Sequence, residues 1–149
     1  MLTGTFRRTV DDKHRIAVPK KLRVALQGDE NGEDAKPLFV TPGTDGSLAI
    51  YSEIEFKKLA SKLDERSPTG KDVRAFSRMF YSRAQRVEMD SQGRIRIEPE
   101  LVQLAKLEKD VVMVGVGNRI ELWSEESWQA YEAKMQAQFD QLAEDAFGG

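Results

Sequence analysis

The sequence predicts an α+β fold in which one structural plan is built twice along a single chain. Two stretches, VDDKHRIAVPKKL at 10–22 and MDSQGRIRIEPEL at 89–101, share an aspartate, an arginine four residues later, alternating apolar residues and a proline. Most matching positions lie 79 residues apart. The alternation indicates half-buried strands, and the apolar i, i+3, i+4 spacing after each proline indicates a short helix. We therefore expect two tandem repeats that mix strands and helices.

The size and composition of the chain limit its class. At 149 residues it fits one ordinary domain or two small ones that share a core, and a half of about 70 residues would be marginal alone. The absence of cysteine excludes disulfides and thiolate metal sites and agrees with a reducing interior. The first residues lack the apolar core of a signal peptide, and the longest uncharged apolar stretch is too short to span a membrane. We expect a cytoplasmic protein with no membrane partner.

The first repeat is expected over residues 5–54, with strands on both sides of the Asp-x-x-x-Arg turn, then a helix and a closing hairpin. The expected elements are strands at 5–10 and 16–18, a helix after Pro19 that ends at Gly28, a polar surface loop at 28–36, and hairpin strands at 38–40 and 48–52. The buried face of this helix is expected to carry Leu22, Ala25 and Leu26.

The second repeat is expected over residues 83–126 and follows the same order. Its elements are strands at 84–89 and 95–97, a helix after Pro99 that buries Leu101, Leu104 and Ala105, and hairpin strands at 111–116 and 120–124. The loop of the first repeat has no counterpart here, because the offset between matching positions falls from 79 to 72 across it.

Helices are expected to join the repeats, over 55–82, and to end the chain, over 127–149. Ser52 and Glu55 form the pattern of a capping box at the start of the first of these helices. In the linker, a helix at 73–81 is expected to turn Val73, Phe76 and Phe80 inward. The tail is expected to continue after Trp128 as one amphipathic helix through Phe139 and Leu142.

The charge is distributed unevenly, although the whole chain is slightly acidic, with 23 basic and 25 acidic residues. Residues 1–26 carry seven basic and two acidic side chains, and residues 71–96 carry seven basic and three acidic ones. The remaining segments are strongly acidic. Positive charge is therefore concentrated around the duplicated motif, which allows a local basic face suited to a polyanion.

The duplicated arginines are the best candidates for function. Arg15 and Arg94 keep both their residue type and their distance from Asp11 and Asp90, whereas neighbouring positions drift. Arginine presents a planar fork that binds a phosphate or a guanine edge through two hydrogen bonds, and a nearby carboxylate can hold that fork in place. The alternative is an exposed ion pair worth about 0–1 kcal/mol to stability. The full set of candidate DNA-binding residues is Arg15, Arg94, Asp11, Asp90, Lys13, Arg7, Arg86 and Arg96.

His14, the only histidine, has two interpretations. It could bind a metal or act as a base, but no second histidine or cysteine completes such a site. Its counterpart is Gly93, which favours a turn position with positive φ, where histidine is enriched among non-glycine residues. A contact between the imidazole ring and a phosphate stays open.

Two further functional interpretations are weaker. The aromatic residues Trp123, Trp128 and Tyr131 could stack nucleotide bases, but their spacing is more typical of core or subunit contacts. An enzyme is not expected, because the chain offers no convincing nucleophile–base set.

These motifs together resemble the MraZ family of bacterial transcription regulators, in the SpoVT/AbrB-like superfamily. The resemblance covers nearly the whole chain and rests on G-T-F-R at 4–7, D-x-K-x-R-I-x-V-P at 11–19, D-S-x-G-R-I-x-I at 90–97 and E-L-W-S at 121–124. The family usually has glycine where His14 stands. The resemblance implies two tandem AbrB-like repeats that form a swapped-hairpin β-barrel with peripheral helices. It also implies that Arg15 and Arg94 bind DNA, with Asp11 and Asp90 as their partners in the motif.

The resemblance further implies a ring-shaped homo-oligomer that binds short repeats upstream of the division and cell-wall gene cluster, which includes the family's own gene. We therefore expect a sequence-specific regulator that binds double-stranded DNA and associates with the nucleoid, with no cofactor and no small-molecule substrate. An alternative is an antitoxin-like AbrB relative whose tail, 129–147, neutralises a protein partner.

Overall fold

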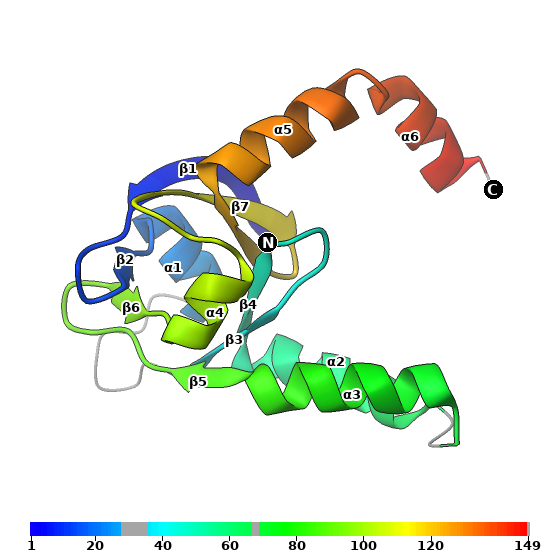
Figure 1. The fold of residues 1–149 in the computed structure, drawn as a ribbon, viewed down its shortest axis with the longest axis horizontal. Coiled ribbons are helices and arrows are strands. Elements are labelled where there is room, and N and C mark those ends of the chain that lie inside the picture. Colours follow the sequence, from blue (N-terminus) through cyan, green and yellow to red (C-terminus); the bar gives the residue numbers. More distant parts are fainter. Residues whose placement is uncertain (28–35, 67–68, 149) are drawn as a thin grey trace.

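The chain folds into two halves that have the same order of elements and exchange strands with each other (Figure 1). The computed structural model describes residues 1–27, 36–66 and 69–148. The first half contains β1 (Leu2–Thr9), β2 (Arg15–Ala17), α1 (Lys20–Gln27), β3 (Leu38–Pro42), β4 (Leu48–Ser52) and α2 (Glu53–Asp64). After α3 (Lys71–Arg83), the second half contains β5 (Gln85–Val87), β6 (Arg94–Arg96), α4 (Pro99–Leu104), β7 (Asp110–Gly117), β8 (Ile120–Ser124) and α5 (Glu125–Gln136), and the last helix is α6 (Phe139–Phe147).

Six strands form one antiparallel sheet in the order β1-β7-β8-β4-β3-β5. The first strand of each half extends the hairpin of the other half, because β1 pairs with β7 and β5 pairs with β3. The two hairpins meet at β4 and β8, where Ala49 lies opposite Glu121. These two residues are equivalent at the offset of 72, so the sheet is related to itself by an approximate two-fold axis through this pair.

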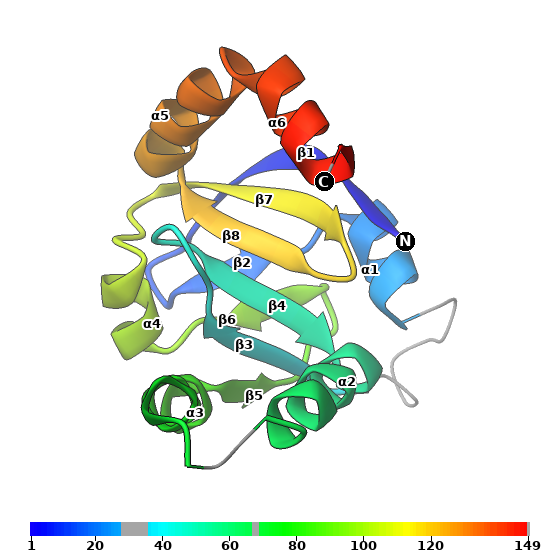
Figure 2. The same ribbon diagram turned by 90° about the vertical axis from the view of Figure 1, so that its right-hand side faces the viewer.

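The remaining two strands, β2 and β6, pair with each other as a separate antiparallel ribbon. Figure 2 shows this ribbon behind the large sheet, with α1 and α4 on either side of it. The α+β class with two repeats is therefore confirmed. Closure into a barrel is not confirmed, because β1 and β5 end the six-stranded sheet and do not pair with each other.

The hydrophobic core lies between the ribbon, the two short helices and the large sheet. Each part contributes apolar side chains that are almost inaccessible to solvent, namely Ile16, Leu22, Leu38, Ile50, Ile95, Leu101, Met113 and Leu122. Leu22 and Leu101 occupy equivalent positions on α1 and α4, as the apolar spacing predicted. Burial of a side chain of this size contributes about 1.5–3 kcal/mol to stability. The buried side chains of the ribbon and of the two helices therefore hold the ribbon against the large sheet.

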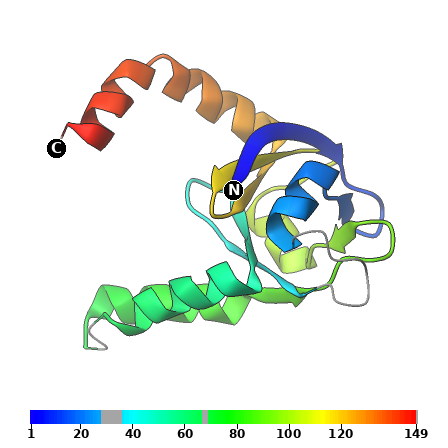
Figure 3. The ribbon, with the colours of Figure 1, turned by 180° about the vertical axis from the view of Figure 1, so that it is seen from behind.

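The helices α2 and α5 begin where the sequence predicts and are capped by equivalent serines. The Ser52 hydroxyl accepts a hydrogen bond from the Glu55 backbone N–H at 3.2 Å, and the Ser124 hydroxyl accepts one from the Ser127 N–H at 3.1 Å. Figure 3 shows that α2 with α3, and α5 with α6, extend from the same side of the sheet.

Three expectations about the helices are wrong. Ala25 of α1 and Leu104 of α4, expected on the buried faces, are exposed, because Leu22 and Leu101 make the core contact of these short helices. Phe76 is half exposed, because Phe80 already fills the space against Phe56 and Phe76 stacks on the outer side of Phe80 with ring centroids 5.3 Å apart. The tail is two helices, because the backbone leaves the helical conformation at Gln138, whose φ is −114°. The end of the first short helix at Gly28 and the loop at 28–36 lie, except for Lys36, outside the described residues.

Within the described ranges, no helix is long and apolar enough to cross a membrane. Over the same ranges, no three histidine, cysteine or acidic side chains come together as metal ligands would.

Candidate nucleic-acid interface

The first turn, Asp11–Arg15, is organised around one carboxylate. Oδ1 of Asp11 accepts hydrogen bonds from the backbone N–H groups of Lys13 at 2.9 Å and Arg15 at 2.8 Å. Its Oδ2 accepts one from Nε of the Arg15 side chain at 2.7 Å. The backbone closes the turn, because the N–H of Asp11 donates to the Arg15 carbonyl at 3.0 Å. A single aspartate therefore fixes both the turn and the guanidinium that leaves it.

The second turn, Asp90–Arg94, repeats this geometry. Oδ1 of Asp90 accepts from the N–H groups of Gln92 and Arg94, both at 2.9 Å, and Oδ2 accepts from Nε of Arg94 at 2.8 Å. The N–H of Asp90 donates to the Arg94 carbonyl at 2.9 Å. The equivalence of every bond shows that the shared spacing in the sequence encodes one local structure.

The fourth position of each turn has a left-handed backbone. His14 has φ 60° and Gly93 has φ 74°, and the N–H of each donates to the carbonyl of the aspartate three residues earlier at 3.0 Å. The interpretation of His14 as a turn residue with positive φ is confirmed.

The ribbon fixes the two turns at its opposite ends. The N–H of Val18 donates to the Gly93 carbonyl, and the N–H of Ile97 donates to the His14 carbonyl, both at 2.9 Å. Each repeat thus binds the turn of the other repeat, and the two turns form one rigid unit.

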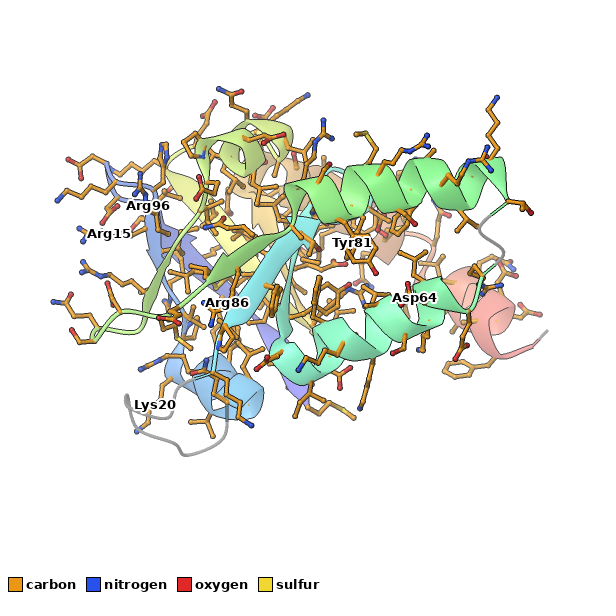
Figure 4. The ribbon with its side chains drawn as sticks, turned by 90° about the horizontal axis from the view of Figure 1, so that it is seen from below. Arg15, Lys20, Asp64, Tyr81, Arg86 and Arg96 are labelled. Carbon is orange, nitrogen blue, oxygen red and sulfur yellow. The ribbon has the colours of Figure 1, made fainter. Side chains whose placement is uncertain are left out.

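Three arginines gather on this ribbon. Arg15 lies opposite Arg96, and Ala17 lies opposite Arg94, in the register of β2 and β6. Figure 4 shows Arg15 and Arg96 together at one end of the molecule, with Lys20 of α1 toward the same end. Lys13 is exposed on the first turn. The ribbon therefore presents a compact basic surface despite the net charge of −2 of the whole chain.

The two motif arginines are held firmly yet keep free donors. Only Nε of each guanidinium binds its aspartate, and in the described part of the chain Nη1 and Nη2 of Arg15 and Arg94 make no hydrogen bond. The side chains are 31% and 27% exposed. Each fork is therefore oriented in advance, with two amino groups open to a ligand.

The environment keeps both aspartates charged. The hydrogen bond from the backbone N–H of Arg15 is the main cause that lowers the pKa of Asp11 below its ordinary value of 3.8, and it outweighs the opposing effect of burial. The Arg15 side chain and the Lys13 N–H lower the pKa further. The pKa of Asp90 is lowered in the same way by Arg94 and Gln92. Hydrogen bonds to the ionised form stabilise it, so both turns stay assembled at neutral pH.

Two of the candidate residues lie elsewhere. Arg7 is on β1 and pairs with Glu125 of α5, with Nε and Oε1 3.0 Å apart. Arg86 is on β5, and its Nη1 lies 3.3 Å from Oε1 of Glu88. These strands are the opposite edges of the large sheet. The structure thus brings together six of the eight candidates, on the ribbon and its turns, and leaves Arg7 and Arg86 outside this group.

One residue near the turns was missed by the sequence reasoning. Arg23 of α1 lies against Gly93. A Cβ atom added to Gly93 would be only 2.8 Å from Nη1 of Arg23. The sequence marks Arg23 only as one of the basic residues in segment 1–26. The repeat does not single it out, because the equivalent residue in the second repeat is Val102.

The aromatic residues of the second half form a packed cluster. Trp123 is buried, and its ring lies 5.4 Å from that of Trp128 and 4.9 Å from that of Tyr131, measured between centroids. These rings pack on each other between β8 and α5. The arrangement favours core packing over a base-stacking platform.

Comparison with known proteins gives one consistent result. A family model described as "MraZ protein, putative antitoxin-like" matches twice, over residues 1–79 and 80–148. Curated relatives named "Transcriptional regulator MraZ" are similar to the chain over 97% of its length and 96% of theirs. They include proteins of Ligilactobacillus salivarius at 43% identity, Desulforamulus reducens at 41% and Natranaerobius thermophilus at 40%.

Proposed function

Since the chain belongs to the MraZ family, whose curated members are named transcriptional regulators, we propose that it regulates transcription by binding double-stranded DNA sequence-specifically through its two turns. The observation that carries this proposal is the pair of identical turns, each with a guanidinium held through Nε and two free amino groups. This is the arrangement that a bidentate contact to guanine O6 and N7, or to a phosphate, requires.

The shape of the ribbon supports the proposal. The major groove of B-form DNA admits a two-stranded β-ribbon, and β2 with β6 is such a ribbon, supported by the core on its inner face. In this arrangement Arg15 and Arg94 read base edges, while Lys13 and Arg96 contact phosphates. Asp11 and Asp90 orient the arginines. We place Arg7 and Arg86 at the margins, where they would add attraction to the DNA backbone.

Phosphate contacts would supply salt-dependent affinity, and the two arginines would supply base discrimination. Following the family resemblance, we propose that the target is a set of short promoter repeats upstream of the division and cell-wall gene cluster, including the gene for this protein. The protein would then act in the cytoplasm at the nucleoid, without a cofactor, a small-molecule substrate or an enzymatic step.

We also propose that the two halves are related as swapped hairpins, the first over 5–54 and the second over 83–126, with 55–82 linking them and 127–149 as a tail. The exchange of β1 and β5 between the hairpins supports this relationship. The copies would assemble into a closed, ring-shaped homo-oligomer. Exposed apolar side chains on α3 and α6 favour such an assembly, because they leave hydrophobic surface to be covered. They include Phe76, Met79, Phe139, Leu142 and Phe147.

The proposed function is tested by DNase footprinting on the DNA upstream of its own gene. The wild-type protein should protect short repeats at physiological salt, whereas the Arg15→Ala/Arg94→Ala variant should not protect them. If this double variant protects the same repeats, the turns are structural and the proposed site is wrong.

A second candidate function is suggested by the family description, which includes the words antitoxin-like. The exposed Phe139, Leu142 and Phe147 of α6 would then contact a protein partner. Affinity purification of the full chain from its own cells separates the two functions. A stoichiometric partner lost on Phe139→Ser, together with no footprint, would support the antitoxin-like function.

A further inference from the structure

The two turns differ in one respect, which is the side chain that lies over their left-handed residue. Gly93 is buried, whereas the equivalent His14 is partly exposed. The cover over Gly93 is Arg23 of α1, since a Cβ built on Gly93 would lie 2.8 Å from Nη1 of Arg23 and 3.0 Å from its Cδ and Cζ. A side chain at position 93 would displace the guanidinium from this space.

The second repeat has no arginine at the equivalent position. The residue equivalent to Arg23 is Val102 of α4, which is partly buried against the hydrophobic core. The second turn has a glycine, Gly93, and the helix of the other repeat has Arg23. The first turn has His14, and the equivalent helix position of the other repeat is Val102. The second turn therefore has a positive charge from α1 beside it, whereas the first turn carries its own Lys13 where the second carries Gln92.

Arg23 is held in place and has no acidic partner among the described residues. Its helix is anchored by the fully buried Leu22, and its backbone N–H donates to the Pro19 carbonyl at 2.9 Å. Its Nε is buried and makes no hydrogen bond, and among the described residues no carboxylate lies within ion-pair distance. A buried donor without a partner calls for an explanation, and an anion that arrives from outside would meet the guanidinium beside the second turn.

We propose that Arg23 is a phosphate-binding residue that serves the second turn only, so that the two turns of each chain bind phosphates through different basic residues. This inference rests on the proposed function. The anion is a DNA phosphate and not a free one, because Arg23 adjoins the turn of Arg94, whose Nη1 and Nη2 make no hydrogen bond among the described residues. The first turn, with His14 and Val102, binds without this additional contact.

The experiment measures binding of labelled promoter duplex by the full chain at several salt concentrations. Arg23→Met keeps the apolar stem and removes the charge, and Arg78→Met removes the same charge from α3 as a control. We expect Arg23→Met to weaken binding roughly three- to tenfold, for promoter and unrelated duplexes alike, and to reduce the salt slope by about one. Arg78→Met should behave as the wild type does, and Arg23→Lys should restore the slope.

A second comparison ties the effect to one turn. Arg23→Met should add little in the Arg94→Ala background and act at full strength in the Arg15→Ala background. An unchanged salt slope in Arg23→Met, while Arg94→Ala weakens binding, overturns the role of Arg23 and leaves the proposed function intact. If Arg15→Ala and Arg94→Ala both bind as the wild type does, the proposed function itself fails. If Arg23→Met lowers the melting temperature, Arg23→Lys decides, since failure of a folded lysine variant to restore the slope overturns the inference.

Discussion

Ile16 lies directly opposite Ile95 at the centre of the β2–β6 ribbon, and both side chains are almost completely buried. The two residues are equivalent in the two repeats, so the approximate two-fold axis of the molecule passes between them. One turn lies at each end of the ribbon, next to this central pair. The apolar pair therefore sets the separation and direction of the two arginine turns, while the polar bonds within each turn set the orientation of its guanidinium.

Because the apolar pair, and not the arginines, holds the ribbon in the core, we expect the arginines to contribute little to the stability of the fold. Arg15→Ala and Arg94→Ala should each leave the melting temperature within a few degrees, because partly exposed ion pairs contribute about 0–1 kcal/mol. Each change should weaken binding to promoter DNA, and both together should nearly abolish it. Thermal unfolding and fluorescence anisotropy on the same samples measure the two effects. Ile16→Ala is the contrasting variant, with an expected loss of about 2–5 kcal/mol of stability. If Arg15→Ala/Arg94→Ala lost as much stability as Ile16→Ala, the arginines would be structural.

The left-handed conformation of His14 leads to a second prediction. A non-glycine residue with positive φ costs about 1 kcal/mol, and glycine relieves this strain but loses about 0.5–1 kcal/mol through its freer unfolded chain. His14→Gly should therefore leave the free energy of unfolding unchanged or slightly raised, and DNA binding within a few fold. Denaturant unfolding and anisotropy provide the measurements. A loss of binding near a hundredfold would instead assign a direct contact to the imidazole.

The local structure of the turns could be predicted from the sequence because it depends on neighbouring residues. The aspartate, the arginine four positions later and the glycine or histidine between them determine a turn closed by its own hydrogen bonds, and both copies adopt it. The hairpins and the serine caps are local in the same sense. The same spacing occurs twice in the chain, and it encodes the same turn both times.

The pairing between the repeats could not be predicted in the same way, because it depends on contacts between residues far apart in the chain. Nothing near β1 in the sequence indicates that Phe6 pairs with Met113 of β7, or that Arg7 meets Glu125. The position of Arg23 over Gly93 also depends on the neighbouring repeat. The inward direction expected for Phe76 failed for the same reason, since Phe80 takes the available space.

The lowered pKa values of Asp11 and Asp90 predict sensitivity to acid. A carboxyl group whose pKa is lower in the folded state stabilises it above the unfolded value near 3.8, and this contribution is lost as the pH falls through the folded pKa. The wild-type melting temperature should thus exceed that of Asp11→Asn/Asp90→Asn above about pH 5, with a difference that shrinks toward about pH 3. Calorimetry at several pH values provides the measurement. Glu132→Gln/Glu144→Gln, on the exposed tail helices, is the control and should show a smaller change. A difference between wild type and the asparagine variant that grows on acidification would contradict the assigned role of the carboxylates.

The apolar surface of α6 predicts a specific effect on assembly. Phe139 and Phe147 are 62% and 92% exposed, which is costly for aromatic side chains unless another copy covers them. Phe139→Gln/Phe147→Gln should shift the protein to smaller species without lowering its melting temperature. Light scattering coupled to gel filtration measures the mass. Val116→Thr, a change of an exposed apolar residue on β7, should leave the mass unchanged. A wild-type protein that is monomeric at micromolar concentration would rule out the ring.

The duplication of the turn leads to the last prediction, which concerns the spacing of the target. Each chain delivers two arginines from one rigid ribbon, so neighbouring copies in a closed oligomer would present such ribbons at regular intervals along one face of the duplex. The protected repeats should then be spaced by about one helical turn, roughly 10–10.5 base pairs. Inserting about 5 base pairs between two repeats turns one of them to the opposite face and should sharply weaken binding, whereas inserting about 10 should largely preserve it. Arg15→Lys and Arg94→Lys refine the test, because lysine keeps the attraction to phosphates but cannot make the two-pronged contact. Both variants should keep the salt dependence and lose about 1–3 kcal/mol of discrimination against a changed base. Equal binding to the half-turn and full-turn insertions would show that single ribbons bind independently, in which case the duplication serves the fold and not the reading of repeated DNA.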